Sequence, residues 1–332
     1  MTTQMDILPD FDLLTPTLDL HCHLRGTIPP TLAAKLAREH DIQLPNAATG
    51  NEYSFSGFDD FLSLYDQVGH VIRTAGDLRD VAYQYIETIS LGGTLYVEFM
   101  ISPGHSVANG IPFDSQVSAI SDAIEQAECE LGVYGCIVVT CVRHRGPEEA
   151  IVIAELVASQ KSRYVRGFGL TGNENLFAID EFKGAFMVAE GAGLGLTAHA
   201  GEWSPAVTVL EAVNSLNLSR VGHGISVATN PDIMTELVER KIGFEVCLSS
   251  NVHLGASRSF EEHPARKMLD AGCSITFSTD DPAYFKTTPQ QEMQLAISHL
   301  EVTAYEQRKC FDDGVEMAFC DDQTKSKILS IW

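Results

Sequence analysis

Seven polar residues in this 332-residue chain have types and spacings that could assemble a catalytic metal site. His21 and His23 lie two apart in the run TLDLHCH, so both side chains point to one face if that run is a strand. The others are His199, Glu202, His223, Asp280 and Asp281. Three imidazoles and one carboxylate suit zinc and leave a position for water. The combination predicts a catalytic site with a single metal ion.

Each of these signals is weak when it is taken alone. An HxH pair is often incidental, and a lone His199 or His223 is more typical of a hydrogen-bonded core histidine than of a metal ligand. Asp281 followed by Pro282 favours a turn. The metal-site prediction therefore depends on whether the fold brings all seven residues to one place.

A rhythm of β-rich runs separated by helical stretches indicates the fold. The eight runs span residues 17–23, 94–100, 133–141, 165–170, 194–200, 220–226, 242–250 and 273–280. Their nearly continuous apolar character is typical of a parallel sheet buried on both faces. Eight such strands predict an α/β fold of the (β/α)8 TIM-barrel type. The alternative, an open doubly wound sheet, lacks a glycine-rich phosphate turn after the first run.

One connection is abnormally long, because the first and second runs are separated by residues 24–93. Helical patterns at about 31–40, 58–72 and 77–91 predict a helical insertion there. On a barrel it would rise from the face where the strands end. It could then serve as a lid or as a packed structural appendage. The whole chain, residues 1–332, is expected to form a single metal-dependent barrel domain with this insertion.

The barrel gives the seven polar residues a common location. The carboxyl ends of barrel strands converge on one mouth, where active sites of this fold lie. His21 and His23 close the first run, His199 the fifth, and Asp280 the eighth. His223 follows the apolar part of the sixth run. We therefore expect the seven side chains to meet at the mouth.

Composition limits the partners and the compartment. Asp plus Glu number 45 against 22 Lys plus Arg, and the resulting net charge of −23 argues against nucleic acid or a membrane surface as partner. No run of eighteen apolar residues occurs, and the start MTTQMDILPDFDLL has no export-signal pattern. The eight cysteines form no CxxC pair, which indicates reduced thiols and a cytoplasmic protein. The sequence does not indicate an oligomeric state.

Finer expectations concern helix starts and the remaining histidines. Ser204–Pro205 and Asn230–Pro231 are typical of a capping residue followed by proline at the first helical position. Two histidines, His105 and His253, follow strand ends and could line the mouth. Five others are expected on the surface or in packing roles: His40, His70, His144, His263 and His299.

Six segments carry a resemblance to a known family. They are HCHLRGTIPP (21–30), TGNE (171–174), HAGE (199–202), VGHG (221–224), EVCLSSN (245–251) and STDDP (278–282). In this order and spacing they resemble the adenosine/adenine deaminase family of the amidohydrolase superfamily. The resemblance implies a (β/α)8 barrel with one Zn²⁺ ion per chain. It also implies hydrolytic removal of the 6-amino group of a purine.

The resemblance also implies residue roles. The zinc ligands would be His21, His23, His199 and Asp280, and Asp280 counts among the catalytic residues. His223 would orient the zinc-bound water and help to deprotonate it, and Glu202 would carry a proton to N1 of the purine. Asp281 would bond to N7, which requires a shared proton because two acceptors cannot bond directly. The backbone N–H of Gly172 would approach N3.

Two positions depart from the family pattern and bear on the substrate. Arg25 stands where the family commonly has Asp or Glu, and an arginine favours a carboxylate or phosphate. It could contact an anionic substituent of the purine or pair with a protein carboxylate. Trp203 adds an aromatic residue after HAGE that could narrow the pocket.

The motifs disagree about the substrate, since DPAYF is similar to adenine-directed members while GLTGNE and EVCLSSN are closer to nucleoside deaminases. The leading prediction is a small-molecule 6-aminopurine nucleoside, adenosine or a derivative. The alternatives are adenine, an N6-substituted adenine, or an adenosine derivative with an anionic 5′ group such as aminodeoxyfutalosine. A catalytically silent binding protein is disfavoured because every position of the constellation is filled.

Overall fold

A computed structural model of the chain describes residues 15–332. The argument against an export signal concerns residues 1–14, which lie outside the described residues. In the described range, no helix combines the length and the apolar character needed to cross a bilayer. All eight cysteines fall in this range and are free thiols, as predicted.

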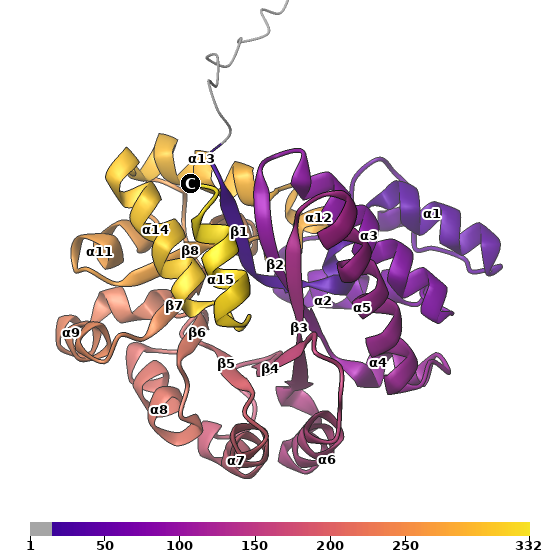
Figure 1. Ribbon diagram of the computed structural model, residues 1–332, viewed down its shortest axis with the longest axis horizontal. Helices are drawn as coiled ribbons and strands as arrows, with labels where there is room; N and C mark the ends of the chain where they lie inside the picture. Colours follow the sequence, from indigo (N-terminus) through magenta and orange to yellow (C-terminus); the bar gives the residue numbers. More distant parts are fainter. Residues whose placement is uncertain (1–14) are drawn as a thin grey trace, which may run out of the picture.

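Eight parallel strands form the centre of the protein and neighbour one another in sequence order (Figure 1). Their bounds are Thr17–His23 (β1), Thr94–Ile101 (β2), Tyr134–Val142 (β3), Val165–Thr171 (β4), Gly195–Ala200 (β5), Arg220–His223 (β6), Gly243–Val246 (β7) and Ser274–Phe277 (β8). A bridge between Cys22 and Asp280 joins β1 to the segment after β8. The predicted (β/α)8 barrel is confirmed.

The last three strands are shorter than the runs that predicted them. β6 ends at His223 instead of residue 226, β7 at Val246 instead of 250, and β8 at Phe277 instead of 280. His223 and Asp280 have φ angles of 57° and 62°, in the left-handed region, where the extended backbone of a strand cannot continue. Two of the predicted site residues thus lie where the chain turns out of the sheet.

Helices surround the strands on the outside (Figure 1). The larger ones are α3 (Ala75–Ser90), α5 (Phe113–Glu130), α6 (Pro147–Ala158), α7 (Lys183–Gly191), α8 (Ala206–Leu216), α9 (Pro231–Glu239), α11 (Ala265–Asp270), α13 (Pro289–Leu300), α14 (Ala304–Met317) and α15 (Asp322–Leu329). In α5, Val117, Ile120 and Ile124 repeat at helical spacing and are buried. Such stripes cover the apolar outer face of the sheet.

Short helical turns occupy several connections between strands and helices. They are α4 (Pro103–Ala108), η3 (Arg143–Arg145), η4 (Ile179–Phe182), η5 (Ile225–Thr229), α10 (Leu248–Leu254) and α12 (Pro282–Phe285). α10 begins at Leu248, inside the segment that was predicted to continue the seventh strand. The EVCLSSN motif is therefore half strand and half helix.

The connection from β1 to β2 is helical, as predicted. It contains η1 (Leu24–Thr27), α1 (Pro30–Glu39), η2 (Asn46–Ala48), α2 (Gly57–Gly69) and α3. Phe61, Leu64 and Val68 form the buried stripe of α2. This stripe fixes α2 against the barrel, so that the helix can contribute side chains to the mouth.

One predicted helix start is confirmed and the other is wrong by one residue. Asn230 accepts a hydrogen bond from the backbone N–H of Ile233, and Pro231 opens α9. α8 instead begins at Ala206, after Pro205, and Ser204 does not cap it. The Ser204 hydroxyl donates to the carboxylate of Glu174, and this long-range contact is invisible to a local capping argument.

The end of the barrel opposite the mouth is closed by the segment after α14. Glycines at positions 167 and 195 leave room for the ring of Phe319, because a side chain at either position would collide with that ring. Above it lies the buried Arg220, whose guanidinium carbon is 3.6 Å from the centre of the Phe319 ring. We call this region the floor of the barrel.

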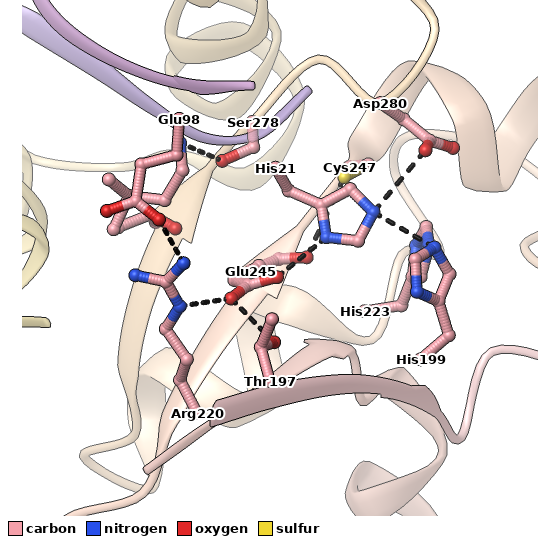
Figure 2. A network of polar contacts seen from close by, with 12 residues as sticks. His21, Glu98, Thr197, His199, Arg220, His223, Glu245, Cys247, Ser278 and Asp280 are labelled. Atoms are coloured by element: carbon pink, nitrogen blue, oxygen red, sulfur yellow. Dashed lines mark hydrogen bonds and ion pairs between the residues drawn. The ribbon is translucent and has the colours of Figure 1, made fainter. Parts of the chain in front are cut away.

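Arg220 is the centre of a charged network in the floor (Figure 2). It pairs with Glu98 on β2 and with Glu245 on β7. Its Nη1 donates to the carbonyl of Met317 at 2.9 Å, and the backbone N–H of Phe319 donates to Glu98 at 2.7 Å. The floor therefore pairs its buried charges within the chain.

Candidate active site

Four predicted ligands converge at the mouth of the barrel. Nε2 of His199 lies 3.1 Å from Nε2 of His21 and 3.3 Å from Nε2 of His23. Oδ1 of Asp280 lies 3.4 Å and 3.2 Å from the same two atoms of His21 and His23. Ligands that are each about 2.0–2.1 Å from a tetrahedral metal ion stand about 3.3 Å apart. Four of the six separations among these atoms have that spacing.

Hydrogen bonds outside the cluster fix the tautomers of two of these histidines (Figure 2). Nδ1 of His21 donates to Glu245 at 2.7 Å, and Nδ1 of His199 donates to the carbonyl of Leu170 at 3.0 Å. Each neutral ring then presents a lone pair on Nε2. Two lone pairs and a carboxylate oxygen facing one another require a cation. The donor set therefore fits a metal ion.

The electrostatics of the cluster agree with this conclusion. Burial opposes ionisation, but Arg220 and His21 lower the pKa of Glu245 to about 2. Burial also disfavours a charged His21, yet hydrogen bonds with Asp280 and Glu245 outweigh it and raise the pKa of His21 to about 10. Positive charge is thus favoured at this point, whether a proton or a metal ion supplies it.

His223 lies beside the cluster and lines a cavity at the mouth of the barrel. Its ring centre is 4.9 Å from that of His21 and 5.1 Å from that of His199. Together with Asp280, these three histidines also offer atoms within 4.8 Å of one another. Proximity alone therefore does not separate His223 from the ligands.

Glu202 faces the cluster from the loop after β5. Its Oε2 lies 3.8 Å from Nε2 of His223, and its Oε1 accepts from the side-chain amide of Asn251 at 3.3 Å. Burial, together with the charges of Asp280 and Glu174, raises the pKa of Glu202 well above its usual range. Glu202 can therefore hold a proton at neutral pH.

Glu174 holds the loop that carries Glu202. Its carboxylate accepts from the backbone N–H groups of Gly201 at 2.8 Å and Glu202 at 3.0 Å, and also from the hydroxyl of Ser204. These three hydrogen bonds fix the geometry of the loop. Glu174 entered the sequence-based prediction only as part of the TGNE motif, without a role of its own.

Asp281 and Gly172 line one part of the cavity, and Gly26 leaves room for Asp281. Asp281 lines the cavity, and its buried Oδ1 has no hydrogen-bond partner among residues 15–332. Burial and the neighbouring Asp280 raise the pKa of Asp281 well above its usual range. A side chain at Gly26 would collide with Asp281. Gly172 lines the cavity with a φ of 98°, a conformation that favours glycine.

The insertion supplies much of the apolar wall of the cavity. α2 contributes Phe58, Phe61, Leu62 and Tyr65, so the insertion covers the mouth. His105 also lines the cavity, as expected. His144 does so too, and its predicted surface or packing role is wrong because η3 follows directly on β3.

Arg25 and Trp203 lie outside this cavity lining. Nη2 of Arg25 donates to the backbone carbonyl of Asp66 at 3.3 Å, and its guanidinium lies 5.3 Å from the ring centre of Tyr65. Trp203 is 36% exposed, with its ring 5.5 Å from that of Phe58. Substrate contact by either residue stays a prediction.

Known proteins resemble the chain over nearly its full length. It is 33% identical over 312 residues to an adenine deaminase of Rhizobium meliloti (strain 1021), covering 94% of this chain and 96% of that relative. The crystal structure of an adenine deaminase from Arthrobacter aurescens is similar with a TM-score of 0.90, at 28% identity, over 95% of this chain and 97% of that one.

A second solved structure concerns the metal. An amidohydrolase from Burkhoderia ambifaria, with bound zinc, has a TM-score of 0.87 at 28% identity, over 96% of this chain and 90% of that one. The family model for adenosine deaminase matches residues 16–331. The chain therefore belongs to the adenosine deaminase family and is a hydrolytic deaminase.

Proposed function

We propose that this protein hydrolyses adenine to the 6-oxo purine and ammonia, with one zinc ion held by His21, His23, His199 and Asp280. The observation that carries the proposal is that one cavity has groups that require a cation on one side and carboxyl groups that can hold protons on the other. On one side, nitrogen lone pairs and a carboxylate oxygen require a cation. On the other side, two carboxyl groups, Glu202 and Asp281, have raised pKa values and can hold protons.

Zinc fits this donor set and, when bound, lowers the pKa of water to about 7. The residues of the chain do the rest. Glu202 donates its proton to N1 of the ring, which makes C6 susceptible to attack. The water oxygen bonds to C6 as one of its protons passes to Asp280 and on to the amino nitrogen. The bond from C6 to this nitrogen then breaks, ammonia leaves, and the second water proton returns to Glu202 as the C6 carbonyl forms. Burial opposes ionisation of Asp280, but the neighbouring histidines outweigh burial and hold the pKa of Asp280 well below its usual range. An ionised acceptor therefore lies beside the attacking water.

The purine would be positioned by groups at the rim of β4 and β8. A protonated Asp281 donates to N7, and the backbone N–H of Gly172 approaches N3. The aromatic residues of α2 cover the ring and exclude water from the site.

Adenine is preferred over a nucleoside for two reasons. The relatives that align over 94% of this chain are named adenine deaminases, which favours the alternative that the sequence motifs ranked second. Arg25 also bonds to the backbone of α2, so η1 supplies no acceptor to the cavity for a ribose hydroxyl.

The test is ammonia release by zinc-loaded protein with adenine, N6-substituted adenine, adenosine and a 5′-anionic adenosine derivative. We expect the highest kcat/KM with adenine. Glu202→Gln should lower turnover by about 10²–10⁴, while the exposed Glu211→Gln should leave it intact. A higher kcat/KM for either nucleoside would overturn the proposed substrate. No turnover of any of the four by zinc-loaded protein would overturn the proposed reaction.

A further inference from the structure

Beneath the mouth, three buried polar side chains form a hydrogen-bonded chain that ends at His223. The chain begins at the backbone N–H of Ala265, which donates to Nδ1 of His263 at 3.1 Å. A backbone N–H can only donate, so Nδ1 of His263 carries a lone pair and the proton of the neutral ring is on Nε2. His263 is 2% exposed, so water does not compete for these positions.

The proton on His263 orients the next side chain. Nε2 of His263 lies 3.2 Å from Oδ1 of Asn251 and donates to it. The amide nitrogen of Asn251 must then point the other way, where it lies 3.1 Å from Nδ1 of His223 and 3.3 Å from Oε1 of Glu202. Asn251 is fully buried, and each of its polar side-chain atoms is paired.

The amide of Asn251 in turn fixes His223. An amide nitrogen only donates, so Nδ1 of His223 accepts and the ring proton is on Nε2. His21 and His199 have the opposite arrangement, because their Nδ1 atoms donate and their Nε2 atoms carry lone pairs. Three imidazoles within about 5 Å of one another are thus held in two tautomers.

We propose that Asn251 and His263 are positioning residues that hold His223 as a hydrogen-bond donor to the oxygen attacking the purine. The inference rests on the proposed function. His223 then has no lone pair facing the cavity, so it neither ligates the metal nor accepts a proton from water. This differs from the role that the family resemblance implied, in which His223 helps to deprotonate the water.

Reversing the arrangement would break a second contact. For Nδ1 of His223 to become the donor, the Asn251 amide must rotate so that its oxygen faces His223. Its nitrogen would then face the N–H of His263, and two donors cannot bond to each other. Because Ala265 fixes His263 through the backbone, side-chain rotation elsewhere does not relieve this clash.

The same amide also locates the proton on Glu202. Oε1 of Glu202 accepts from Asn251, so the acidic proton belongs on Oε2. Oε2 is the oxygen nearer to Nε2 of His223, at 3.8 Å. One asparagine thus sets both the donor that faces the attacking oxygen and the acid that faces the ring.

The test is a long-range proton–nitrogen correlation spectrum of zinc-loaded protein labelled with ¹⁵N-histidine. His223→Gln supplies the assignment and should retain about one zinc per chain, whereas His23→Gln should lose it. We expect His223 with a proton on Nε2 only, unchanged between pH 6 and pH 9. A proton on Nδ1 in the wild-type protein, or loss of zinc from His223→Gln, would overturn the inference.

A charge change at Asn251 sharpens the test. Asn251→Asp presents an acceptor to Nδ1 of His223, so a proton should appear on that nitrogen. Asn214→Asp, at an exposed position of α8 bonded to Arg240, should leave the spectrum unchanged. An unchanged His223 in Asn251→Asp would overturn the control by Asn251. The spectra are recorded without purine, so these results stand apart from the choice of adenine as substrate.

Discussion

The two ends of the barrel bury charge in opposite ways. In the floor, the cation Arg220 lies between the carboxylates of Glu98 and Glu245, and backbone groups satisfy the rest. At the mouth, His21 and His199 turn lone pairs toward each other, and Oδ1 of Asp281 has no partner in the described part of the chain. The paired charges of the floor are therefore expected to stabilise the fold, and the unpaired groups of the mouth to bind ligands.

This contrast has a physical basis. A buried ion is costly unless partners compensate it, so uncompensated charged groups gathered in one cavity point to a ligand that completes them. The charges of the floor are paired without a ligand, whereas the mouth leaves groups that the proposed metal ion and purine would pair. Glu245 joins both ends, because it pairs with Arg220 and also accepts from His21.

The largest expected effect is at the mouth. Glu202→Gln should lower kcat by about 10²–10⁴, because an amide cannot donate the proton that general acid catalysis needs. Steady-state kinetics with adenine measures the loss, and zinc content checks that the metal site is intact. A kcat close to that of the control Glu211→Gln would mean that Glu202 is not the general acid.

Substitutions in the floor should lower the free energy of unfolding. Arg220→Met leaves the buried carboxylates of Glu98 and Glu245 without their shared cation and should cost about 3–5 kcal/mol in the free energy of unfolding. Arg240→Met removes an exposed arginine that pairs with Glu236 and should cost less than about 1 kcal/mol. Urea unfolding compares the two variants. Equal costs would contradict the structural role of the floor.

Glu292 is a buried carboxyl that has hydrogen bonds but no cationic partner among residues 15–332, so it shows what burial does without a neighbouring positive charge. It accepts from the backbone of Ser249 at 3.2 Å and the hydroxyl of Thr287 at 2.7 Å, yet burial raises its pKa from 4.5 to about 7. Between those pH values the native chain keeps a proton that the unfolded chain releases, so stability falls as pH rises. The loss is about 3 kcal/mol in total.

Glu292→Gln should remove this part of the pH dependence. Unfolding free energies at pH 4.5 and pH 8 should therefore differ less in the variant than in the wild-type protein. Glu211→Gln, at an exposed position of α8, should keep the wild-type difference. Identical pH profiles for all three proteins would mean that hydrogen bonds alone compensate the buried charge.

Glu245 sharpens the comparison because it belongs to both ends. Glu245→Gln weakens the acceptor that orients His21 and should lower zinc affinity by about 10–100-fold. Competition with a chelator measures the affinity. Glu236→Gln, on the outer helix α9, should leave it unchanged. Unaltered affinity in Glu245→Gln would show that the floor does not support the metal site.

The smallest effect is expected for Arg25. Its guanidinium bonds to the backbone of α2 and lies outside the cavity lining, so Arg25→Met should change the ratio of kcat/KM for adenine and adenosine by less than about threefold. Parallel kinetics with both substrates checks this. A larger change would restore the sequence-based prediction that Arg25 contacts the substrate.

The sequence predicted the barrel and the convergence of its polar residues for a simple reason. Strand ends of a barrel meet by topology, so His21, His199 and Asp280 could be brought together without knowing any contact. The early ends of β6 and β8 were missed, because left-handed backbone at His223 and Asp280 has no local signature in non-glycine residues.

Other features were beyond sequence reasoning because they depend on pairs far apart in the chain. Glu174 reaches Ser204 across 30 positions, and Arg220 reaches Glu98 across 122. Glu174 and Asn251 do lie in motifs that the resemblance used, TGNE and EVCLSSN. Their motifs indicated family membership, but only their contacts indicate what they do.

The central claim is that the charges at the mouth are unpaired because they await one metal ion. The most direct test is native mass spectrometry of metal-free protein titrated with zinc, with His199→Ala in parallel. We predict one tightly bound zinc per chain for the wild-type protein and none for the variant. No bound zinc in the wild-type protein, or equal binding by both proteins, would contradict the account.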